Sequence, residues 1–475
     1  MADRYLCVHG HFYQPPRENP FTLDLPRETG AEPYHDFNQK INAECYRPNS
    51  VLGNFEHLSF DLGPTLSTWL EQYDPETYSR IVAAERANYQ RHGCGNGMAQ
   101  SYNHTILPLD NRRDKQTQVY WGIADFWHRF GHAPEGMWLP EAAVDMETLE
   151  VLTENDICFT ILGQSQAIHD DLDTSRPYLL NLSNGSTIAA LFFDAPVSFQ
   201  VSFIPEATLD ADAFMYHHVY PRHDWASRGQ QGDKPFLLMA TDGELYGHHA
   251  PLRELFLEYL FRAAAPQAGF ETIYPARYLR LRPPRDVMVI REHTSWSCAH
   301  GIERWNHGCS CTEGDSSWKR PFREALNTLA REIDALSERE TRLLLRDFWG
   351  ARDRYIWVRL GDLSRMEYLA QESARNLTSA DEQRIISLME AQYFRQYMFT
   401  SCPFFWEDPS REEAQHSMAC AARAIDLVRQ VTGISLEVVF RSGLSRVWSQ
   451  QSGQNGDHIY QRMLLEQLGP TARAA

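Results

Sequence analysis

The sequence predicts an α/β fold in which a barrel of parallel strands and helices is followed by an all-helical C-terminal domain. Short apolar runs alternate with amphipathic segments up to about residue 290, which is the pattern of a parallel sheet. So many alternating units in one chain indicate a closed or nearly closed barrel. From about Trp318 the segments become long, amphipathic and rich in Arg and Glu. We therefore expect a barrel domain over residues 1–317 and a helical domain over residues 318–475.

The first two strands should carry polar side chains at their ends. A β-prone run at residues 5–8 leads into His9 and His11. Because side chains alternate along a strand, both histidines should point to the same side if the strand continues that far. A second strand candidate lies within residues 56–61.

Capping residues predict three helices. Asp74, followed by proline, begins a helix that Gly93 ends. Asp114 opens a second helix, whose apolar residues recur at helical spacing up to Gly131. Asp145 is placed to cap a third helix that runs to about residue 155.

The later strands are predicted from apolar runs and turn residues. A buried strand is expected at residues 157–162, and residues 178–182 and 187–193 flank Ser-Asn-Gly as a hairpin. The clearest core strand is at residues 234–241. A helix should then run from Pro251 to about Ala265. The remaining pieces are short strands near residues 273 and 287–290, and helices at 319–348, 351–375, 380–399, 411–431 and 435–449, before a tail from Ser452 whose end is expected to be frayed.

Composition restricts the class of partner and the compartment. The formal net charge is -18, which disfavours binding to a nucleic acid because such binding needs a positive field. No window approaches the roughly 18 apolar residues of a membrane span, and the N-terminus has no signal-peptide pattern. The nine cysteines are an odd number and are scattered, as expected of reduced thiols. We expect a cytoplasmic protein that binds neither nucleic acid nor membrane.

Two carboxylates follow apolar strands at their expected ends. Glu141 closes the run GMWLPE at residues 136–141, and Asp242 follows the strand at 234–241. Carboxylates at the C-terminal ends of barrel strands are common catalytic positions. Two of them facing one cleft can cleave a glycosidic bond, one as nucleophile and the other as proton donor. The alternative for Glu141 alone is an acidic residue at a helix N-terminus, favoured by the macrodipole.

Four ordered motifs resemble those of glycoside hydrolase family 57. They are HGHFYQP at residues 9–15, NHTILPL at 103–109, MWLPE at 137–141 and DGELYGH at 242–248. The resemblance continues through TSWSC at residues 294–298 to Trp305, and MFTSC at 398–402 resembles one subgroup of uncharacterised members.

This resemblance implies a (β/α)7 barrel with a helical domain, and retaining cleavage of α-1,4 links in starch, glycogen or maltooligosaccharides, with transfer to sugar acceptors as a second outcome. By its motifs, Glu141 would be the nucleophile and Asp242 the general acid/base, with Glu244 in reserve. Neither a cofactor nor a catalytic metal is implied. The expected substrate-binding residues are His9, His11, His104, Trp138, Glu244, His248, Trp296 and Trp305, and His11 is preferred over His9 as the subsite histidine.

Several other functions fit parts of the sequence. The same two carboxylates would serve an α-glucan branching enzyme or a 4-α-glucanotransferase, because water and a sugar hydroxyl compete for one intermediate. His9, His11, His104 and Asp242 could instead hold a metal, as in carbohydrate deacetylases or zinc mannosidases, although a tight His-x-x-x-His pair is absent. A barrel that binds glycans without turnover is the non-enzymatic alternative.

The C-terminal cysteines form a separate cluster. Cys298, Cys309 and Cys311 have His300 and His307 nearby. The spacing Cys-x10-Cys-x-Cys differs from the paired Cys-x2-Cys of structural zinc modules, which favours a cluster of free thiols over a zinc site. GCGNG at residues 93–97 lacks the Gly-Lys-Ser/Thr of a nucleotide loop, and no Gly-x-Ser-x-Gly elbow is present.

Overall fold

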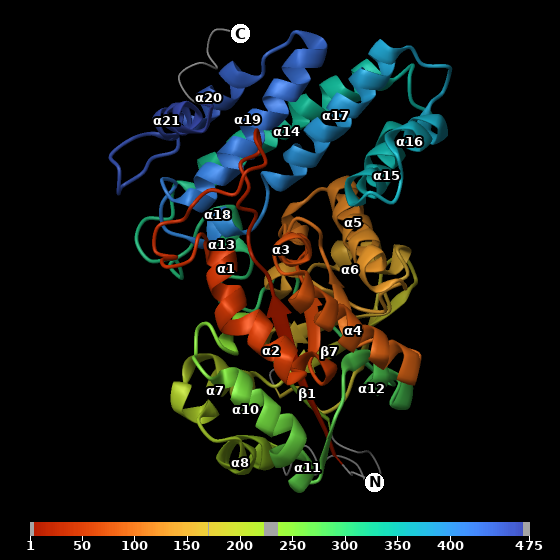
Figure 1. The fold of residues 1–475 in the computed structure, drawn as a ribbon, viewed down its shortest axis with the longest axis vertical. Coiled ribbons are helices and arrows are strands. Elements are labelled where there is room, and N and C mark those ends of the chain that lie inside the picture. Colours follow the sequence, from red (N-terminus) through yellow and green to blue (C-terminus); the bar gives the residue numbers. More distant parts are fainter. Residues whose placement is uncertain (1–3, 170, 223–235, 469–475) are drawn as a thin grey trace. The chain divides into compact units, whose positions relative to one another are not determined.

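The computed structural model describes residues 4–169, 171–222 and 236–468 (Figure 1), which form two compact units. Unit 1 comprises Met1–Gln14, Arg27–Tyr102 and Asp125–Ser297, and unit 2 comprises Pro15–Pro26, Asn103–Ala124 and Cys298–Ala475. This division differs from the single boundary between residues 317 and 318 that the sequence predicts. Two segments from the first third of the chain make most of their contacts with the C-terminal helices instead.

Unit 1 contains the sheet. Its strands are β1 (Arg4–Phe12), β2 (Ser59–Leu62), β3 (Gly97–Gln100), β4 (Met137–Trp138), β5 (Phe159–Gly163), β6 (Tyr178–Asn181), β7 (Thr187–Phe193), β8 (Phe236–Asp242), β9 (Phe270–Thr272) and β10 (Asp286–Met288). Its helices are α1 (Phe37–Ile41), α2 (Arg47–Leu52), α3 (Pro64–Tyr73), α4 (Pro75–His92), α6 (Met146–Glu154), α7 (Ala195–Phe203), α8 (Ala211–Phe214), α10 (Arg253–Tyr259), α11 (Ala265–Gln267) and α12 (Pro275–Leu281).

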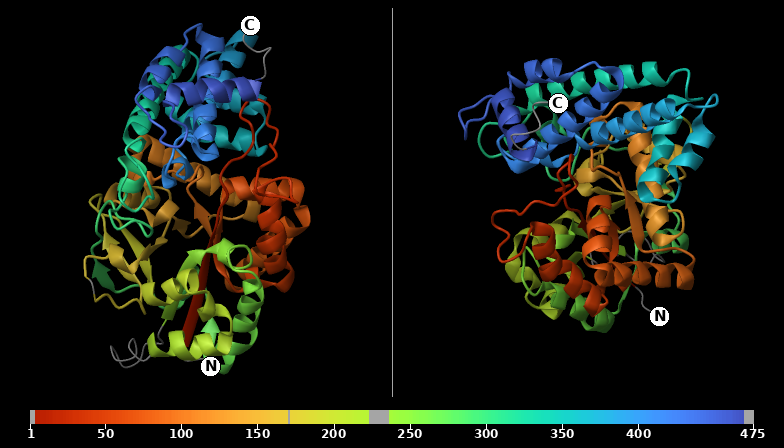
Figure 2. Two further views of the ribbon diagram at one scale, coloured as in Figure 1. Left: turned by 90° about the vertical axis from the view of Figure 1, so that its left-hand side faces the viewer. Right: turned by 45° about the horizontal axis from the view of Figure 1, so that its top comes forward.

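Seven of the described strands close into a barrel. β8, β1, β2, β3 and β4 pair in that order, all parallel, and β5 pairs with β7 in parallel. The first gap is closed between β4 and β5 by a parallel bridge from Gly136 to Phe159. The second is closed between β7 and β8, where Asp194 N donates to Leu238 O at 2.7 Å. In Figure 2 the strand β1 runs inside unit 1 with helices outside it. The predicted (β/α)7 barrel is confirmed.

Two of the three predicted helix starts are confirmed. The exception is Asp114, because α5 (Arg112–Phe130) begins two residues earlier and Asn111 Oδ1 accepts from Asp114 N at 3.0 Å. Asp74 caps α4, accepting from Thr77 N at 3.3 Å, and Gly93 ends it in the left-handed region with φ of 71°. Asp145 caps α6, accepting from Thr148 N at 2.7 Å. The predicted hairpin is also present, because β6 and β7 pair antiparallel.

Side chains of alternating strand positions fill the barrel. Tyr5 and Cys7 of β1 and Leu238 and Ala240 of β8 belong to one buried apolar cluster. Because side chains alternate along a strand, His9, His11 and Asp242 continue these rows towards the C-terminal end of the barrel. The polar candidates therefore lie on top of the apolar core of unit 1.

Unit 2 is helical. Its elements are the first part of α5 (Arg112–Phe130), then α13 (Glu303–Asn306), α14 (Lys319–Thr341), α15 (Phe348–Leu360), α16 (Arg365–Glu372), α17 (Ser379–Tyr397), α18 (Cys402–Phe405), α19 (Glu412–Thr432), α20 (Glu437–Leu444) and α21 (Gly456–Leu468). The long helices α14, α17 and α19 pack side by side (Figure 1). The segment predicted as one helix at residues 351–375 is two helices, because Gly361 ends α15 with φ of 84° and Ser364 caps α16. Helix α21 was not predicted.

Buried polar contacts explain why residues 103–124 belong to unit 2. Arg352 of α15 donates to Asp114 of α5 at 2.9 Å, and both side chains are almost fully buried. Trp121 Nε1 donates to the backbone oxygen of Asp353 at 2.9 Å. A buried ion pair that loses one partner is costly, so these contacts bind the first part of α5 to the helices of unit 2. Within the described residues, no helix is both long and apolar enough to cross a membrane.

Candidate active site

A row of polar residues crosses three adjacent strands at the C-terminal end of the barrel. His11 of β1 is the register partner of Asp61 on β2 and of Asp242 on β8. Across the three strands the order is Asp61, His11 and Asp242, so a histidine lies between two carboxylates. This order places a cationic group between two carboxylates at the edge where barrel folds present their reactive side chains.

Asp61 joins the two predicted histidines. Its two oxygens contact His9 Nε2 at 3.1 Å and His11 Nδ1 at 2.7 Å, and Ser59 Oγ lies 2.9 Å from His9 Nδ1. His9 and His11 thus point to the same side of β1, as predicted. His9 and Asp61 are fully buried, and His11 is 6% exposed.

Charge differs sharply between the two histidines. Burial lowers the pKa of His9 despite the nearby Asp61. Burial acts in the same direction on His11, but the carboxylates of Asp61, Asp242 and Glu244 outweigh it and raise its pKa to about 9. In the opposite sense, His11 and His9 lower the pKa of Asp61 against the effect of burial. At neutral pH His11 is an imidazolium paired with Asp61.

Glu141 lies in a strained turn directly after β4. It has φ of 58° and ψ of 20°, a left-handed conformation that is uncommon for residues with a side chain. Ser297 Oγ donates to Glu141 Oε2 at 2.6 Å, and Trp296 Nε1 donates to the same oxygen at 3.1 Å. Helix α6 begins only at Met146, so Glu141 is not a residue of the helix N-terminus.

The charge of Asp242 acts on Glu141. Burial raises the pKa of Glu141, the hydrogen bond from Ser297 lowers it, and the charge of Asp242 raises it further. Solvent reaches Asp242, yet the surrounding protein raises its pKa by desolvation, and His11 and His249 oppose that rise. Asp242 is therefore close enough to Glu141 for their charges to repel. Such repulsion favours one ionised and one protonated carboxyl.

Glu244 occupies a different environment from Asp242. It is 6% exposed and accepts hydrogen bonds from Tyr46 Oη at 2.7 Å and from Tyr13 N at 3.3 Å. Burial raises its pKa to about 7, with a further contribution from Asp242 and an opposing one from Tyr46. Since its oxygen is already bound by protein donors, Glu244 is suited to hold the structure around Asp242.

A π-helical turn, Asn42–Tyr46, supplies further contacts to this region. His248 Nδ1 lies 2.5 Å from Glu44 Oε2. Gly247, with φ of 139°, approaches the turn so closely that an added Cβ would collide with the backbone oxygen of Glu44. The turn therefore packs directly on the segment that follows Asp242.

The three predicted tryptophans have different surroundings. Trp296 is half-buried and can present part of its ring. Trp138 is 0% exposed and stacks on His9 and His11, with ring centroids 4.8 and 5.3 Å away. Trp305 is also 0% exposed, and its backbone oxygen accepts from Arg323 Nε at 2.6 Å. Trp138 and Trp305 offer no free face to a sugar in this structure, so packing accounts for both rings.

His104 belongs to unit 2. It is buried, has φ of 54°, and its Nδ1 lies 2.6 Å from Ser401 Oγ. Its backbone oxygen accepts from Ser401 N at 3.0 Å. The second and last motifs of the sequence, at residues 103–109 and 398–402, are thus in contact.

The metal hypothesis for the barrel histidines finds no geometric support. Among the residues that the structure describes, the group with ligand atoms close enough for one ion is formed by Cys298, His300, Cys309 and Cys311, and not by His9, His11 and Asp242. The nitrogens of His9 and His11 face Asp61 and Ser59 instead.

Sequence reasoning missed four residues of this site. Asp61 ends the second predicted strand, and a carboxylate at a strand end could have been recognised from the sequence as a site residue. Ser297 adjoins Trp296 within a recognised motif. Tyr46 and Glu44 come from an irregular turn, for which local sequence offers no signal.

Replacing Asp61 with Asn should change how stability depends on pH. The pKa of His11, about 9, lies above its unfolded value of 6.5, so its stabilising contribution is complete below pH 6.5 and is lost as pH rises to about 9. For the natural protein we expect the free energy of unfolding to fall over this range by on the order of 3 kcal/mol from His11 alone. The Asp61→Asn protein should show a clearly smaller fall in denaturant titrations.

The matched control is Asp36→Asn, which alters a pair with exposed His35 while keeping a side chain that can cap α1. Because water screens that pair, its pH profile should follow that of the natural protein. If the free energy of unfolding falls equally with pH in the natural and Asp61→Asn proteins, Asp61 is not the cause of the raised pKa of His11.

Two protein-family models match successive parts of the chain. A model of "Glycosyl hydrolase family 57" matches residues 6–291, and a model described as "Domain of unknown function (DUF3536)" matches residues 315–474. No curated protein matches the chain.

Solved structures share the fold. An exo-type maltose-forming amylase from Pyrococcus sp. ST04 is 15% identical over 97% of this chain and 88% of its own, with a TM-score of 0.73. An α-amylase from Thermotoga maritima is 13% identical over 97% of this chain and 99% of its own, at 0.58. A branching enzyme from Pyrococcus horikoshii is 15% identical over 98% of this chain and 95% of its own, at 0.56.

Proposed function

Because the chain belongs to glycoside hydrolase family 57, we propose that it is a retaining glycosidase that cleaves α-1,4 links of an α-glucan with Glu141 as nucleophile and Asp242 as general acid/base. The observation that carries this proposal is that Asp242 lies beside His11 at the C-terminal end of the barrel strands and that its charge raises the pKa of Glu141. A retaining mechanism needs such a pair at short range, with one carboxyl ionised and the other protonated.

In the first step, protonated Asp242 gives its proton to the glycosidic oxygen while the Glu141 carboxylate attacks the anomeric carbon. The bond between that carbon and the oxygen breaks, and a glycosyl ester on Glu141 forms. Hydrogen bonds from Ser297 and Trp296 favour the ionised form of Glu141 before the attack. Both donors touch the same oxygen, Oε2, which leaves Oε1 as the attacking atom.

In the second step, ionised Asp242 takes a proton from water, whose oxygen attacks the anomeric carbon and releases Glu141. A sugar hydroxyl can replace water, and the product is then a transferred glycan. Asp242 suits this role better than Glu244, because solvent reaches Asp242 while Glu244 is bound by Tyr46 and Tyr13. The exchange of protons at Asp242 requires that access.

Substrate hydroxyls would meet His11, Trp296 and His248. The imidazolium of His11 stands beside Asp242 in the row of three and would donate to a sugar oxygen. The half-buried ring of Trp296 would support a sugar while its Nε1 orients Glu141. His9 lies behind His11 and would keep Asp61 in place.

The glucan substrate is proposed from the named activities of the similar structures, which include amylases, a 4-α-glucanotransferase and branching enzymes. The test is incubation with amylose and, separately, with maltooligosaccharides, followed by chain-length analysis and proton NMR of the first products. We expect shorter α-linked chains whose new reducing ends initially have the α configuration. New branch points, or longer chains from a single oligosaccharide, would favour a transferase. Initial β anomers would exclude the retaining mechanism.

A further inference from the structure

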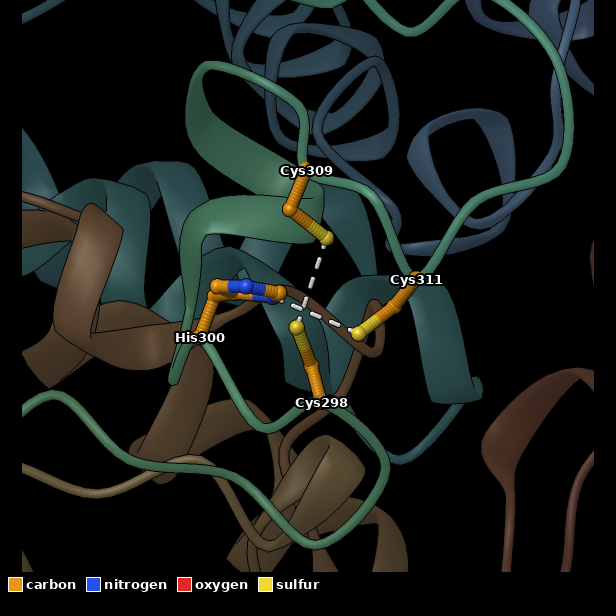
Figure 3. A group of neighbouring side chains, drawn as sticks. All are labelled: Cys298, His300, Cys309 and Cys311. Atoms are coloured by element: carbon orange, nitrogen blue, oxygen red, sulfur yellow. Dashed lines mark hydrogen bonds between the residues drawn. The ribbon is translucent and has the colours of Figure 1, made fainter.

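Four potential metal ligands converge in unit 2, within the loop that precedes α14. The sulfurs of Cys298, Cys309 and Cys311 and a ring nitrogen of His300 all lie within 4.8 Å of one another. Figure 3 shows the four side chains pointing towards a common centre. His307, which is also nearby in sequence, pairs with Glu303 at 3.0 Å and is not part of the group.

The separations fit tetrahedral zinc. Zn–S bonds of about 2.3 Å and Zn–N bonds of about 2.0 Å at tetrahedral angles require S···S distances of about 3.8 Å and S···N distances of about 3.5 Å. Cys298 Sγ lies 3.4 Å from Cys309 Sγ, and Cys311 Sγ lies 3.3 Å from His300 Nδ1. A disulfide would need about 2.05 Å between sulfurs, so the two thiols are not bonded. Small outward shifts of these two pairs would give the distances of a zinc site.

Backbone N–H groups of the same loop donate to the three sulfurs. Backbone amides of His300, Cys311 and Ala299 donate to the sulfurs of Cys298, Cys309 and Cys311, respectively. Three thiolates and one Zn²⁺ leave a net charge of about -1.

Two buried cations lie beside this cluster. Arg304 Nη2 donates to the backbone oxygen of Cys311 at 3.1 Å, and Lys319 Nζ donates to Thr312 Oγ1 at 2.8 Å. Buried cations need anionic partners, and an anionic metal centre would provide one.

The loop has little regular secondary structure. Between Cys298 and Trp318 the structure has one short helix, α13, of four residues. Gly308, with φ of 92°, lies so close to Ser316 that a Cβ there would collide with its backbone oxygen. A metal bound to residues 298, 300, 309 and 311 would join the two ends of this irregular loop.

We propose that Cys298, His300, Cys309 and Cys311 bind one structural zinc ion. Four protein ligands complete a tetrahedral shell and leave no position for a substrate, as in structural rather than catalytic zinc sites. The ligands come as Cys-x-His and Cys-x-Cys, and each pair lies in a turn, with Gly301 N donating to Cys298 O at 3.0 Å and Thr312 N donating to Cys309 O at 3.2 Å. The free-thiol interpretation of the sequence rested on the absence of Cys-x2-Cys, which these pairs do not need.

The zinc ion would also hold the residue that directly follows the two donors to Glu141. Cys298 follows Ser297 directly in the sequence, and Ser297 and Trp296 both donate to Glu141. Fixing Cys298 would restrict the motion of these two donors. The site is nevertheless separate from the proposed glycosidase chemistry, and its test does not depend on activity.

The experiment measures metal in the full-length protein, purified without chelator, by inductively coupled plasma mass spectrometry. We expect about one zinc per chain in the natural protein and in His307→Ala, the neighbouring histidine outside the group. His300→Ala and Cys309→Ser/Cys311→Ser should lose most of it. Cobalt added to the chelator-treated natural protein should give the intense visible bands of a tetrahedral thiolate site, which provides a readout if a variant fails to fold.

Thiol labelling supplies a second measurement. Cys158, exposed and distant in sequence, should react with a thiol reagent at all times, whereas Cys311 should react only after chelator treatment. Natural protein that contains no zinc and gives no tetrahedral cobalt spectrum would overturn the proposal. A mass 2 Da lower, showing a Cys298–Cys309 disulfide, or zinc retained in His300→Ala would overturn it as well.

Discussion

Replacing Glu141 with Gln should lower kcat on an α-glucan by about 10⁴-fold or more, as expected when a covalent nucleophile is removed. The amide cannot form the glycosyl ester, but it has nearly the same shape and can still accept from Ser297 and Trp296 through its oxygen. The fold should therefore persist. Reducing-end assays give kcat, and thermal denaturation reports whether the protein is folded.

Glu154→Gln serves as the control, because Glu154 is exposed and is the last residue of α6, the helix that follows Glu141 in the sequence. It should retain the activity of the natural protein. A folded Glu141→Gln protein with near-normal turnover would remove the basis of the proposed function.

Replacing Asp242 with Asn should lower kcat on natural glucans by about 10²- to 10⁴-fold, the usual contribution of a general acid/base. The loss should depend on the leaving group. A nitrophenyl maltooligosaccharide needs little help from a proton, so its glycosylation step should be much less affected. Burst kinetics with this substrate would then show the glycosyl-enzyme accumulating, since the amide that replaces the Asp242 carboxylate cannot activate water.

Glu244→Gln is the matched comparison for Asp242→Asn. Its amide oxygen can still accept from Tyr46 and Tyr13, as Oε1 of Glu244 does, so any loss of activity should be small and similar for natural and activated substrates. If Glu244→Gln shows the leaving-group dependence and Asp242→Asn does not, the roles of the two acids must be exchanged.

Local sequence signals were sufficient for the barrel but not for its full polar lining. Caps such as Asp74 and Asp145 and terminators such as Gly93 act within one helical turn, so they can be recognised without tertiary information. The alternation of β1 likewise placed His9 and His11 on one side. Asp61 became visible only through strand pairing, because its position beside His11 depends on the register of β1 and β2.

Exposure was the property that the sequence predicted least well. Trp138 and Trp305 lie in motifs beside polar residues, yet tertiary packing covers both rings completely. The left-handed backbone of Glu141 was also unexpected, since a carboxylate has no intrinsic preference for it. The spacing of the cysteines likewise could not predict that His300 and not His307 lies with them, because that geometry arises from the folding of an irregular loop.

The threading of the chain through the two units has an evolutionary consequence. Residues 15–26 and 103–124 belong to the helical unit, although they are encoded between strands of the barrel. A gene fusion or truncation at one point therefore cannot add or remove the helical unit as a whole. Contacts such as Arg352 with Asp114 also require matched changes in distant parts of the sequence. The helical region and the barrel should consequently have diverged together, as one inherited piece, instead of being exchanged among enzymes like an accessory module.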